Sequence, residues 1–297
     1  MNFRILWVLF LVLLIYACGG DGGDSQPAPE PELESLDNCL VSVSSETFEV
    51  ATWNIENYPQ SSNTAELAEQ IIETYNLDMI AVQEITSQAL FQNLVNELAG
   101  WEGFTTQING SNLMLGYLYK TSEVSLVGDA INLYAEDNDT NNDAFTAFRR
   151  PYMVEVNHSS GLNLHLINVH LKCCNGSEDR RRNASVLIKD YIDNNLANEE
   201  VMVLGDFNDE IVDTDNVFQN FIDDSQSYRF STMDIAEGAS SEWSYPSLPS
   251  QIDQILISDE LFDNEQSTQT IKVDECLSTY SSHVSDHRPV LITFSAN

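Results

Sequence analysis

The hydrophobic positions of the chain follow two periods, and each period predicts one kind of element. Short runs of alternating or continuous apolar residues, bounded by polar residues, predict strands. Apolar residues that return every three or four positions predict amphipathic helices. The strands are expected at residues 48–53, 78–84, 113–119, 124–133 with a break near Gly128, 152–156, 162–169, 201–204, 252–257 and 290–294, and the helices at residues 64–75, 87–98 and 178–196.

The order of these elements indicates the fold class. Strands follow one another without an intervening helix from residue 113 to residue 169, and a hairpin is expected around Ser159, Ser160 and Gly161. Such a run favours antiparallel sheets over a simple doubly wound parallel sheet. Residues 134–147 are polar and acidic, so we expect a loop there. With 42% hydrophobic residues, the chain can bury a large core, and the expected fold is one α+β domain over residues 41–297.

The first residues predict an exported protein. Arg4 precedes an apolar run at residues 5–16, which is too short to span a bilayer and suits a signal peptide. The run leads to Cys18, with a small residue before it and Gly19 after it, an arrangement that resembles a bacterial lipoprotein cleavage site. The alternative is an ordinary signal peptide cleaved nearby. We expect a signal peptide at residues 1–17 and a lipoprotein anchored through Cys18, with the outer membrane or cell surface favoured.

Residues 18–40 are rich in Gly, Pro, Ser and acidic residues, which cannot bury a core, so we expect a flexible, lipidated linker. An exported chain meets an oxidising compartment, where disulfides persist. The chain has five cysteines, and without Cys18 the other four allow three full pairings. Cys39 and Cys276 could join the start of the domain to a late segment, and the adjacent Cys173 and Cys174 could bridge each other or pair elsewhere. The sequence leaves this choice open.

The composition is strongly acidic, with 12 basic against 47 acidic residues and a net charge of −35. Most of this charge is expected to keep the protein soluble, and it opposes a long basic footprint on nucleic acid. The few positive residues could focus an anion onto one place, or they could simply be solvated on a helix face. Most of them gather in one part of the sequence or lie beside a motif: Arg149, Arg150, Lys172, Arg180, Arg181, Arg182, Lys189 and Arg288.

Polar side chains that can carry chemistry stand at the ends of several expected strands. Each one alone has an ordinary explanation, such as a turn residue or a satisfied histidine. An acid inside an apolar strand, such as Asp253, needs a partner. Turns and satisfied histidines explain the joint occurrence of all these polar residues much less well. In chain order the residues are Asn54, Glu84, His170, Asp206, Asn208, Asp253, Asp286 and His287.

The segments around these residues resemble the endonuclease/exonuclease/phosphatase superfamily. Gly-Asp-Phe-Asn, Ser-Asp-His and an upstream Gln-Glu form a specific combination. The resemblance implies a four-layer α/β/β/α sandwich with two mainly antiparallel sheets and the polar residues on one edge. The matching segments are Thr52-Trp53-Asn54-Ile55, Val82-Gln83-Glu84, Val169-His170-Leu171, Leu204-Gly205-Asp206-Phe207-Asn208, Ile252-Asp253-Gln254-Ile255-Leu256 and Ser285-Asp286-His287-Arg288-Pro289.

The resemblance also implies a metal site. Glu84 would be the main ligand of a divalent cation, assisted by Asn54 and Asp286. Carboxylate and amide oxygens suit Mg²⁺, with Mn²⁺ or Ca²⁺ as alternatives. An in-line attack on a phosphoester needs such a cation, or cationic donors, to neutralise the phosphate oxygens.

The remaining residues would act on the water and the phosphate. By resemblance, Asp206 would orient or deprotonate the attacking water, and Asn208 would help to hold the phosphate. His287, oriented by Asp253, and His170 would contact the phosphate from two sides. The segment Phe148-Arg149-Arg150-Pro151-Tyr152 resembles the family's Arg-Pro segment, in which an arginine reaches the scissile phosphate, and Arg150 is favoured over Arg149.

The expected function is that of a metal-dependent phosphoesterase of the cell envelope, with a phosphodiesterase such as a nuclease favoured. Its substrate would be a phosphoester, with extracellular nucleic acid as one candidate, and the protein is expected to be monomeric. One alternative is a phosphatase or a sphingomyelinase-like hydrolase, for which Trp243 and Tyr245 would be a membrane-docking patch rather than buried anchors of a loop. A non-catalytic binding protein is the third possibility. Gln251 and Gln254 stand where many members carry a basic residue and an aromatic or histidine, so the substrate stays open.

Overall fold

The computed structural model describes most of the chain after the expected linker. No helix among these residues is long and apolar enough to cross a membrane. The predicted signal peptide, Cys18 and most of the predicted linker lie outside the described residues. The described part runs from residue 36 to residue 295, without residues 45, 107–112, 137 and 147–148.

The first sheet contains six strands. Only β1 and β2 are parallel neighbours, and the other pairs are antiparallel. In spatial order the strands are β12 (Glu265–Thr270), β13 (Val290–Ser295), β1 (Thr47–Tyr58), β2 (Met79–Ile85), β4 (Met114–Lys120) and β3 (Trp101–Thr105).

The second sheet contains seven strands and also has a single parallel pair, β8 with β9. The order is β10 (Tyr228–Phe230), β11 (Asp253–Ser258), β9 (Glu200–Asp206), β8 (Asn163–His170), β7 (Tyr152–His158) and β5 (Val124–Leu126), while β6 (Ile131–Asn132) also pairs with β7. Both sheets are therefore mainly antiparallel, as the sequence predicts.

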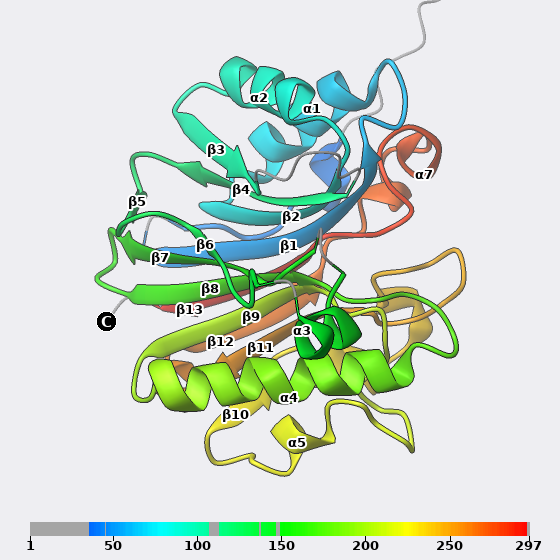
Figure 1. Cartoon of the computed structure of the whole chain (residues 1–297). Coiled ribbons are helices and arrows are strands. Elements are labelled where there is room, and N and C mark those ends of the chain that lie inside the picture. Colours follow the sequence, from blue (N-terminus) through cyan, green and yellow to red (C-terminus); the bar gives the residue numbers. More distant parts are fainter. Residues whose placement is uncertain (1–35, 45, 107–112, 137, 147–148, 296–297) are drawn as a thin grey trace, which may run out of the picture. The chain divides into compact units, whose positions relative to one another are not determined.

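Three buried clusters separate four layers. The first packs α1 (Thr64–Tyr75) and α2 (Gln88–Glu97) against one face of the six-stranded sheet. The second fills the space between the two sheets. The third packs α3 (Asp139–Ala144), α4 (Glu178–Asn195) and α5 (Gln219–Ile222) against the far face of the seven-stranded sheet. Figure 1 shows these helices on the two outer sides of the sheets, which confirms the α/β/β/α sandwich of the α+β class.

The structure also contains elements that the sequence pattern did not predict. The edge strands β3 and β12 each have a single buried position, and the edge strand β10 has only three residues, so their hydrophobic signal is weak. Within the expected loop, α3 forms because the side chain of Asn138 accepts a hydrogen bond from Asn141 N at 2.9 Å. The other short helices and 3₁₀ turns are α6 (Met233–Ala236), α7 (Tyr280–His283), Leu36–Cys39, Ser240–Glu242, Asp259–Leu261 and Val273–Glu275.

The folded body begins before residue 41. Leu36 is 3% exposed and packs in the first buried cluster. Cys39 forms a disulfide with Cys276, across a sequence separation of 237 residues. Residues 36–39 are therefore part of the domain rather than of the flexible linker, and Cys173 and Cys174 are the cysteines left free among the described residues.

A buried acidic pair lies on the first sheet, before the polar end of β1. Glu49 is 1% exposed and its backbone N donates to Asp78 Oδ2 at 3.0 Å. Burial raises the pKa of Glu49 to about 7, and the hydrogen bond with Asp78 and its negative charge add to the rise. Burial alone would raise the pKa of Asp78, but hydrogen bonds with His158 and Glu49 outweigh it and lower this pKa. The pair therefore shares a proton that resides on Glu49.

This pair predicts a pH-dependent stability. The pKa of Glu49 is raised in the folded state, so its contribution to stability is complete below its ordinary pKa of 4.5 and is lost as the pH rises through about 7. Relative to the wild type, Glu49→Gln should gain up to about 3 kcal/mol of unfolding free energy between about pH 5 and pH 8, because glutamine keeps the neutral hydrogen-bonding pattern. Urea unfolding at a series of pH values measures the difference. Parallel curves for the two proteins would contradict the shared proton.

Candidate active site

The topology brings the polar strand ends to one place. β1 and β2 are parallel, as are β8 and β9, so the carboxyl ends of each pair lie together. β13 is antiparallel to β1 and β11 is antiparallel to β9, so both of these strands begin at the same edge. Asp206 pairs in register with His170 on one side and with Asp253 on the other. Sequence segments far apart in the chain thus form one site.

A local distortion turns Glu84 toward this edge. The pairing of β2 with both neighbours shifts register around Glu84, and the residue has a φ of 65° in the left-handed region. A regular strand would place Glu84 on the face opposite to Gln83, which reaches into the second sheet to contact Asn168. The irregular strand instead lets Glu84 Oε2 accept a hydrogen bond from Asn57 N at 3.1 Å. Backbone strain of this kind is concentrated at functional sites.

A bulge at Glu56 and Asn57 within β1 connects the three predicted metal ligands. Both residues of the bulge have positive φ, 40° and 50°. Glu56 N donates to Asn54 Oδ1 at 3.0 Å, and Glu56 Oε2 accepts from Asp286 N at 2.9 Å, while Asn57 N holds Glu84. Burial, and next the charge of Asp286, raises the pKa of Glu56. The structure therefore gathers Asn54, Glu84 and Asp286 around an acidic bulge, whose Glu56 the sequence motifs do not indicate although it lies only two positions after Asn54.

Asp206 is held by hydrogen bonds to both of its oxygens. Asn54 Nδ2 donates to Oδ2 at 3.0 Å, and Asn208 N donates to Oδ1 at 2.8 Å. The side chain is 2% exposed. Burial raises the pKa of Asp206 to about 7, and the negative charge of Asp253 adds to the rise, against the lowering effects of His287 and of the two hydrogen bonds. Asp206 is therefore a fixed carboxylate that can exchange a proton near neutral pH.

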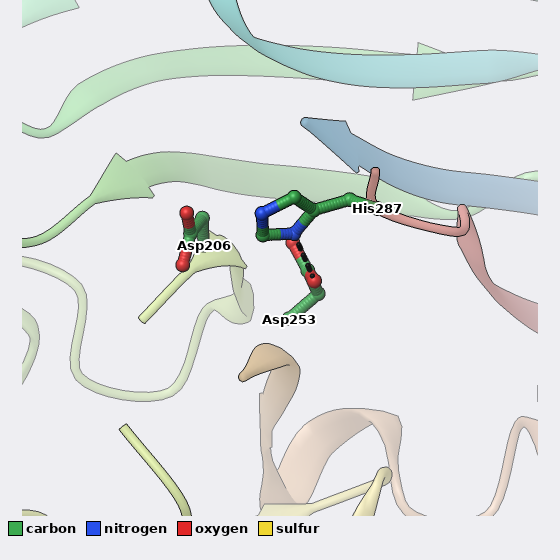
Figure 2. Close-up of side chains that lie close together, drawn as sticks. All are labelled: Asp206, Asp253 and His287. Carbon is green, nitrogen blue, oxygen red and sulfur yellow. Dashed lines mark hydrogen bonds and ion pairs between the residues drawn. The ribbon is translucent and has the colours of Figure 1, made fainter. Parts of the chain in front are cut away.

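His287 and Asp253 form a buried pair beside Asp206. Figure 2 shows the imidazole between the two aspartates, with its Nδ1 2.8 Å from Asp253 Oδ2. Ser244 Oγ donates to the same Asp253 oxygen at 2.6 Å. Burial by itself lowers the pKa of His287, but the charge of Asp253 and their hydrogen bond outweigh burial and raise it to about 10. His287 is therefore a cation at neutral pH.

His170 and Arg149 form a second pair at the site. Arg149 Nη1 lies 2.6 Å from His170 Nε2, which is also 3.4 Å from Asp206 Oδ2 and 3.7 Å from Glu84 Oε1. Burial, and next the charge of Arg149, lowers the pKa of His170 well below its ordinary value. The neutral imidazole therefore accepts a hydrogen bond from the guanidinium, and the positive charge of this pair resides on Arg149.

The structure corrects the choice between the two neighbouring arginines. Arg150 points to α3 rather than to the site. Its Nη1 donates to Asn141 O at 2.5 Å, and its Nη2 donates to Asn142 Oδ1 at 2.6 Å. Asn141 O also accepts from Phe145 N at the C-terminal end of α3, and the carbonyls at this end of a helix attract a cation. The sequence pattern had predicted a loop there, so it contained no competing partner for Arg150. Arg149 is the arginine that contacts the site.

Most of the other positive residues have structural partners. Arg181 pairs with Asp209 at 2.7 Å, Arg182 with Asp215 at 3.0 Å, and Lys189 with Asp224 at 2.8 Å. Arg288 forms a bidentate ion pair with Asp274, in which Nε donates to Oδ1 at 2.6 Å and Nη2 donates to Oδ2 at 2.7 Å. The clustering of basic residues in the sequence therefore reflects ion pairs around α4 and before β13 more than an anion-binding surface.

The aromatic residues near the site serve as anchors of a loop. The Tyr245 ring packs on His287 with the ring centroids 4.8 Å apart, and Trp243 Nε1 donates to Ile235 O at 3.0 Å. Both side chains are partly buried. This favours the buried-anchor interpretation over an exposed membrane-docking patch.

Two groups of residues could hold a cation. Ligand atoms of Asp206, Asp253 and His287 lie within 4.8 Å of one another. His287, however, is protonated and donates from Nδ1 to Asp253, so it has no lone pair to offer a metal there. A hard divalent cation prefers oxygen ligands, which the second group provides through Glu84, Asn54 and Asp286. Hydrogen bonds connect these three residues to Glu56 and Asn57.

The fold and the site define the class of protein. The sequence matches the Endonuclease/Exonuclease/phosphatase family over residues 51–287, and the chain belongs to this family. No curated protein sequence matches the chain significantly. Members of the superfamily hydrolyse phosphoester bonds and generally depend on a divalent metal.

Solved structures show the same fold at low sequence identity. A humanized D. rerio TDP2 is similar with a TM-score of 0.66 at 15% identity, over 84% of this chain and 100% of that chain. The human Nocturnin catalytic domain has a TM-score of 0.64 at 17% identity, over 85% and 95% of the two chains. A mannosyl-6-phosphatase of Bacteroides thetaiotaomicron has a TM-score of 0.62 at 16% identity, over 82% and 98%. These likenesses establish the fold and leave the substrate of this chain to other arguments.

Proposed function

We propose that the protein is a divalent-metal-dependent phosphodiesterase that hydrolyses its substrate by in-line attack of water. The observation that carries this proposal is the buried Asp206, fixed on both oxygens between the Arg149–His170 pair and the His287–Asp253 pair. A carboxylate with a pKa near 7 is suited to take a proton from water. Two cationic side chains beside it are suited to neutralise phosphate oxygens.

Each side chain has a distinct role in this proposal. Asp206 orients the water and accepts its proton, while Arg149 and His287 donate hydrogen bonds to the phosphate from two sides. Asp253 holds the charged imidazole of His287 in place, and Asn208, whose backbone N fixes Asp206, contributes a polar side chain beside the phosphate. A divalent cation held by Glu84, Asn54 and Asp286, with Mg²⁺ favoured, would supply further charge neutralisation at a phosphate oxygen.

The charge of the site supports a diester over a monoester. A phosphate monoester carries about −1.5 to −2 charges at neutral pH, whereas a diester carries a single negative charge. Two cationic side chains, Arg149 and His287, face the carboxylates of Glu56, Glu84, Asp206, Asp253 and Asp286, so added negative charge is poorly compensated. The net charge of −35 also opposes a long duplex footprint, and a short contact with extracellular single strands fits this surface better.

We also propose that the enzyme acts in the cell envelope, as a monomer tethered through a lipidated Cys18. The apolar run at residues 5–16, the cysteine flanked by small residues and the following Gly-, Pro- and Ser-rich segment support this location. The Cys39–Cys276 disulfide is compatible with an oxidising compartment. Release from membranes by detergent, but not by high salt, tests the anchor.

Glu84→Gln tests both the diester preference and the role of the cation. With Mg²⁺, the wild type should hydrolyse bis-p-nitrophenyl phosphate faster than p-nitrophenyl phosphate, and EDTA should abolish both activities. Glu84→Gln should reduce kcat/KM for the diester by about 10²–10³-fold, with partial recovery at higher Mg²⁺, because an amide is a weaker ligand than a carboxylate. Faster hydrolysis of the monoester would favour the phosphatase alternative. Equal hydrolysis by wild type and Glu84→Gln would show that Glu84 is not a metal ligand.

Arg149 and Arg150 form a matched pair for separating chemistry from stability. Arg149→Met should lower kcat/KM by about 10²–10³-fold, because a cationic donor to the phosphate is lost. Arg150→Met should leave kcat within a few-fold and lower stability by about 1–3 kcal/mol, because the hydrogen bonds of the guanidinium to Asn141 O and Asn142 Oδ1 are lost. Initial rates and urea unfolding of both variants measure these effects. A larger loss of activity in Arg150→Met than in Arg149→Met would show that Arg150 is the arginine that contacts the substrate.

A further inference from the structure

The adjacent cysteines lie on the loop that leaves the active site. This loop starts directly after His170, at the end of β8, and leads into α4. The sulfurs of Cys173 and Cys174 are 2.8 Å apart, and both thiols are free. Cys174 is exposed and Cys173 is partly buried. The pair is therefore both close enough to react with itself and open to a reagent from solvent.

The loop is tied to the active site by several contacts. Asn208 Nδ2 donates to Leu171 O at 3.2 Å. Arg181 Nη1 donates to Lys172 O at 2.7 Å and to Cys174 O at 3.2 Å, while its Nε contacts Asp209 at 2.7 Å. Cys173 also lies close enough to Arg149 for the two side chains to interact electrostatically. A change in the backbone around the two cysteines would therefore reach Arg149, His170 and Asn208.

The surroundings of the two sulfurs suit thiol–disulfide chemistry. Lys172 Nζ lies 3.6 Å from Cys173 Sγ, which places a positive charge beside the two sulfurs. Cys174 has a φ of 76°, a left-handed conformation that is uncommon for a residue with a side chain. The other two cysteines of the described domain already bond to each other, so no further intramolecular partner competes there for Cys173 and Cys174.

We propose that Cys173 and Cys174 form a reversible dithiol–disulfide site whose state alters the active site. The oxidant would be a disulfide compound, either a small molecule or a protein. One sulfur–sulfur bond forms between the two cysteines as both S–H protons leave, and the two electrons reduce the oxidant's disulfide to two thiols. The small ring that results forces the Cys173–Cys174 peptide to change conformation, which disturbs the carbonyls that Arg181 holds. The effect on hydrolysis rests on the proposed function, whereas the thiol chemistry does not.

The first test reads the thiols directly. The wild type and Cys174→Ser are each treated with oxidised glutathione or with dithiothreitol and analysed by intact mass and peptide mapping, with the Cys39–Cys276 bond as an internal reference. The wild type should lose two hydrogen atoms from the Cys173–Cys174 peptide without gaining glutathione. Phenylarsine oxide, which bridges neighbouring thiols, should bind the reduced wild type and should bind neither Cys173→Ser nor Cys174→Ser. Failure to form the bond and failure to bind the arsenical would overturn the site.

The second test reads the coupling to the active site. Oxidation should change kcat/KM for bis-p-nitrophenyl phosphate by about fivefold or more in the wild type and leave Cys174→Ser unchanged. A disulfide that forms without changing kcat/KM would overturn the coupling. Cys174→Ser should keep the wild-type melting temperature, because Cys174 is exposed. If no form of the protein hydrolyses any phosphoester, the proposed function fails, and the mass and arsenical results still decide the dithiol site.

Discussion

Asp206→Asn is expected to reduce kcat for phosphodiester hydrolysis by about 10³-fold or more, because an amide cannot accept the proton of the attacking water. The substitution keeps the size of the side chain, and its carbonyl can still accept from Asn208 N. The new amide group would, however, face the donor Asn54 Nδ2, which now bonds to Asp206 Oδ2 at 3.0 Å. The loss should therefore appear mainly in kcat, since the cationic partners of the phosphate, Arg149 and His287, are retained.

The stability of Asp206→Asn should not fall in parallel with its kcat. Burial and the charge of Asp253 raise the pKa of Asp206 to about 7, so the carboxylate is electrostatically unfavourable in the folded state at neutral pH. Removing this charge favours the folded state, whereas the donor–donor contact with Asn54 opposes it, so Asp206→Asn should have about the stability of the wild type. Steady-state kinetics and thermal unfolding measure the two effects. Asp215→Asn, at a position with a 94% exposed side chain, is the matched control. A fall in kcat of less than tenfold would exclude Asp206 as the base.

Gly205→Ala is expected to unfold the domain or to destabilise it by more than about 4 kcal/mol. Gly205 has a φ of 145°, and a Cβ at this position would lie 1.9 Å from the carbonyl oxygen of Val169. That oxygen belongs to the neighbouring parallel strand β8, which cannot move without displacing His170. The glycine is thus required because the backbones of β8 and β9 approach closely next to Asp206.

A substitution at a second glycine distinguishes the steric clash at Gly205 from the cost of a positive φ alone. Gly161 also has a positive φ, 101°, but a Cβ there would meet nothing within 4 Å. Gly161→Ala should therefore cost about 1–2 kcal/mol, the ordinary cost of a left-handed conformation. Soluble yield, circular dichroism and urea unfolding distinguish the two variants. Equal stability of Gly205→Ala and Gly161→Ala would show that β8 and β9 can separate to admit a methyl group.

The predictable part of the fold was the part whose apolar positions are buried. The strand predicted at residues 201–204 became β9 and the helix predicted at residues 64–75 became α1 with the same ends, because burial makes the hydrophobic period strong. The short edge strand β12, Glu265–Thr270, escaped prediction, because its residues are mostly polar and only Thr270 is buried. It forms because β13 offers an open edge for pairing, which is a tertiary fact.

The candidate site could be predicted only in part. Asn54, Glu84, His170, Asp206, Asp253 and His287 follow from motifs at strand ends, and the structure brings them to one edge. Glu56 was not predicted because its contribution depends on a left-handed bulge in β1 that no motif marks. Arg150 was favoured because two adjacent arginines look equivalent in the sequence, and its partners are carbonyls of a helix that was expected to be a loop.

The sequence by itself determined which chemical groups the protein has and the order of the strands that carry them. Apolar periods and specific motifs are local, so they survive in the linear chain. Only the tertiary structure decided which side chains meet. The pKa of Asp206 depends on burial and on Asp253, the charge of His287 depends on that same aspartate, and Arg149 contacts His170 whereas Arg150 contacts α3. Such electrostatic and packing effects arise between segments far apart in the chain, and they exist only once the two sheets have packed together.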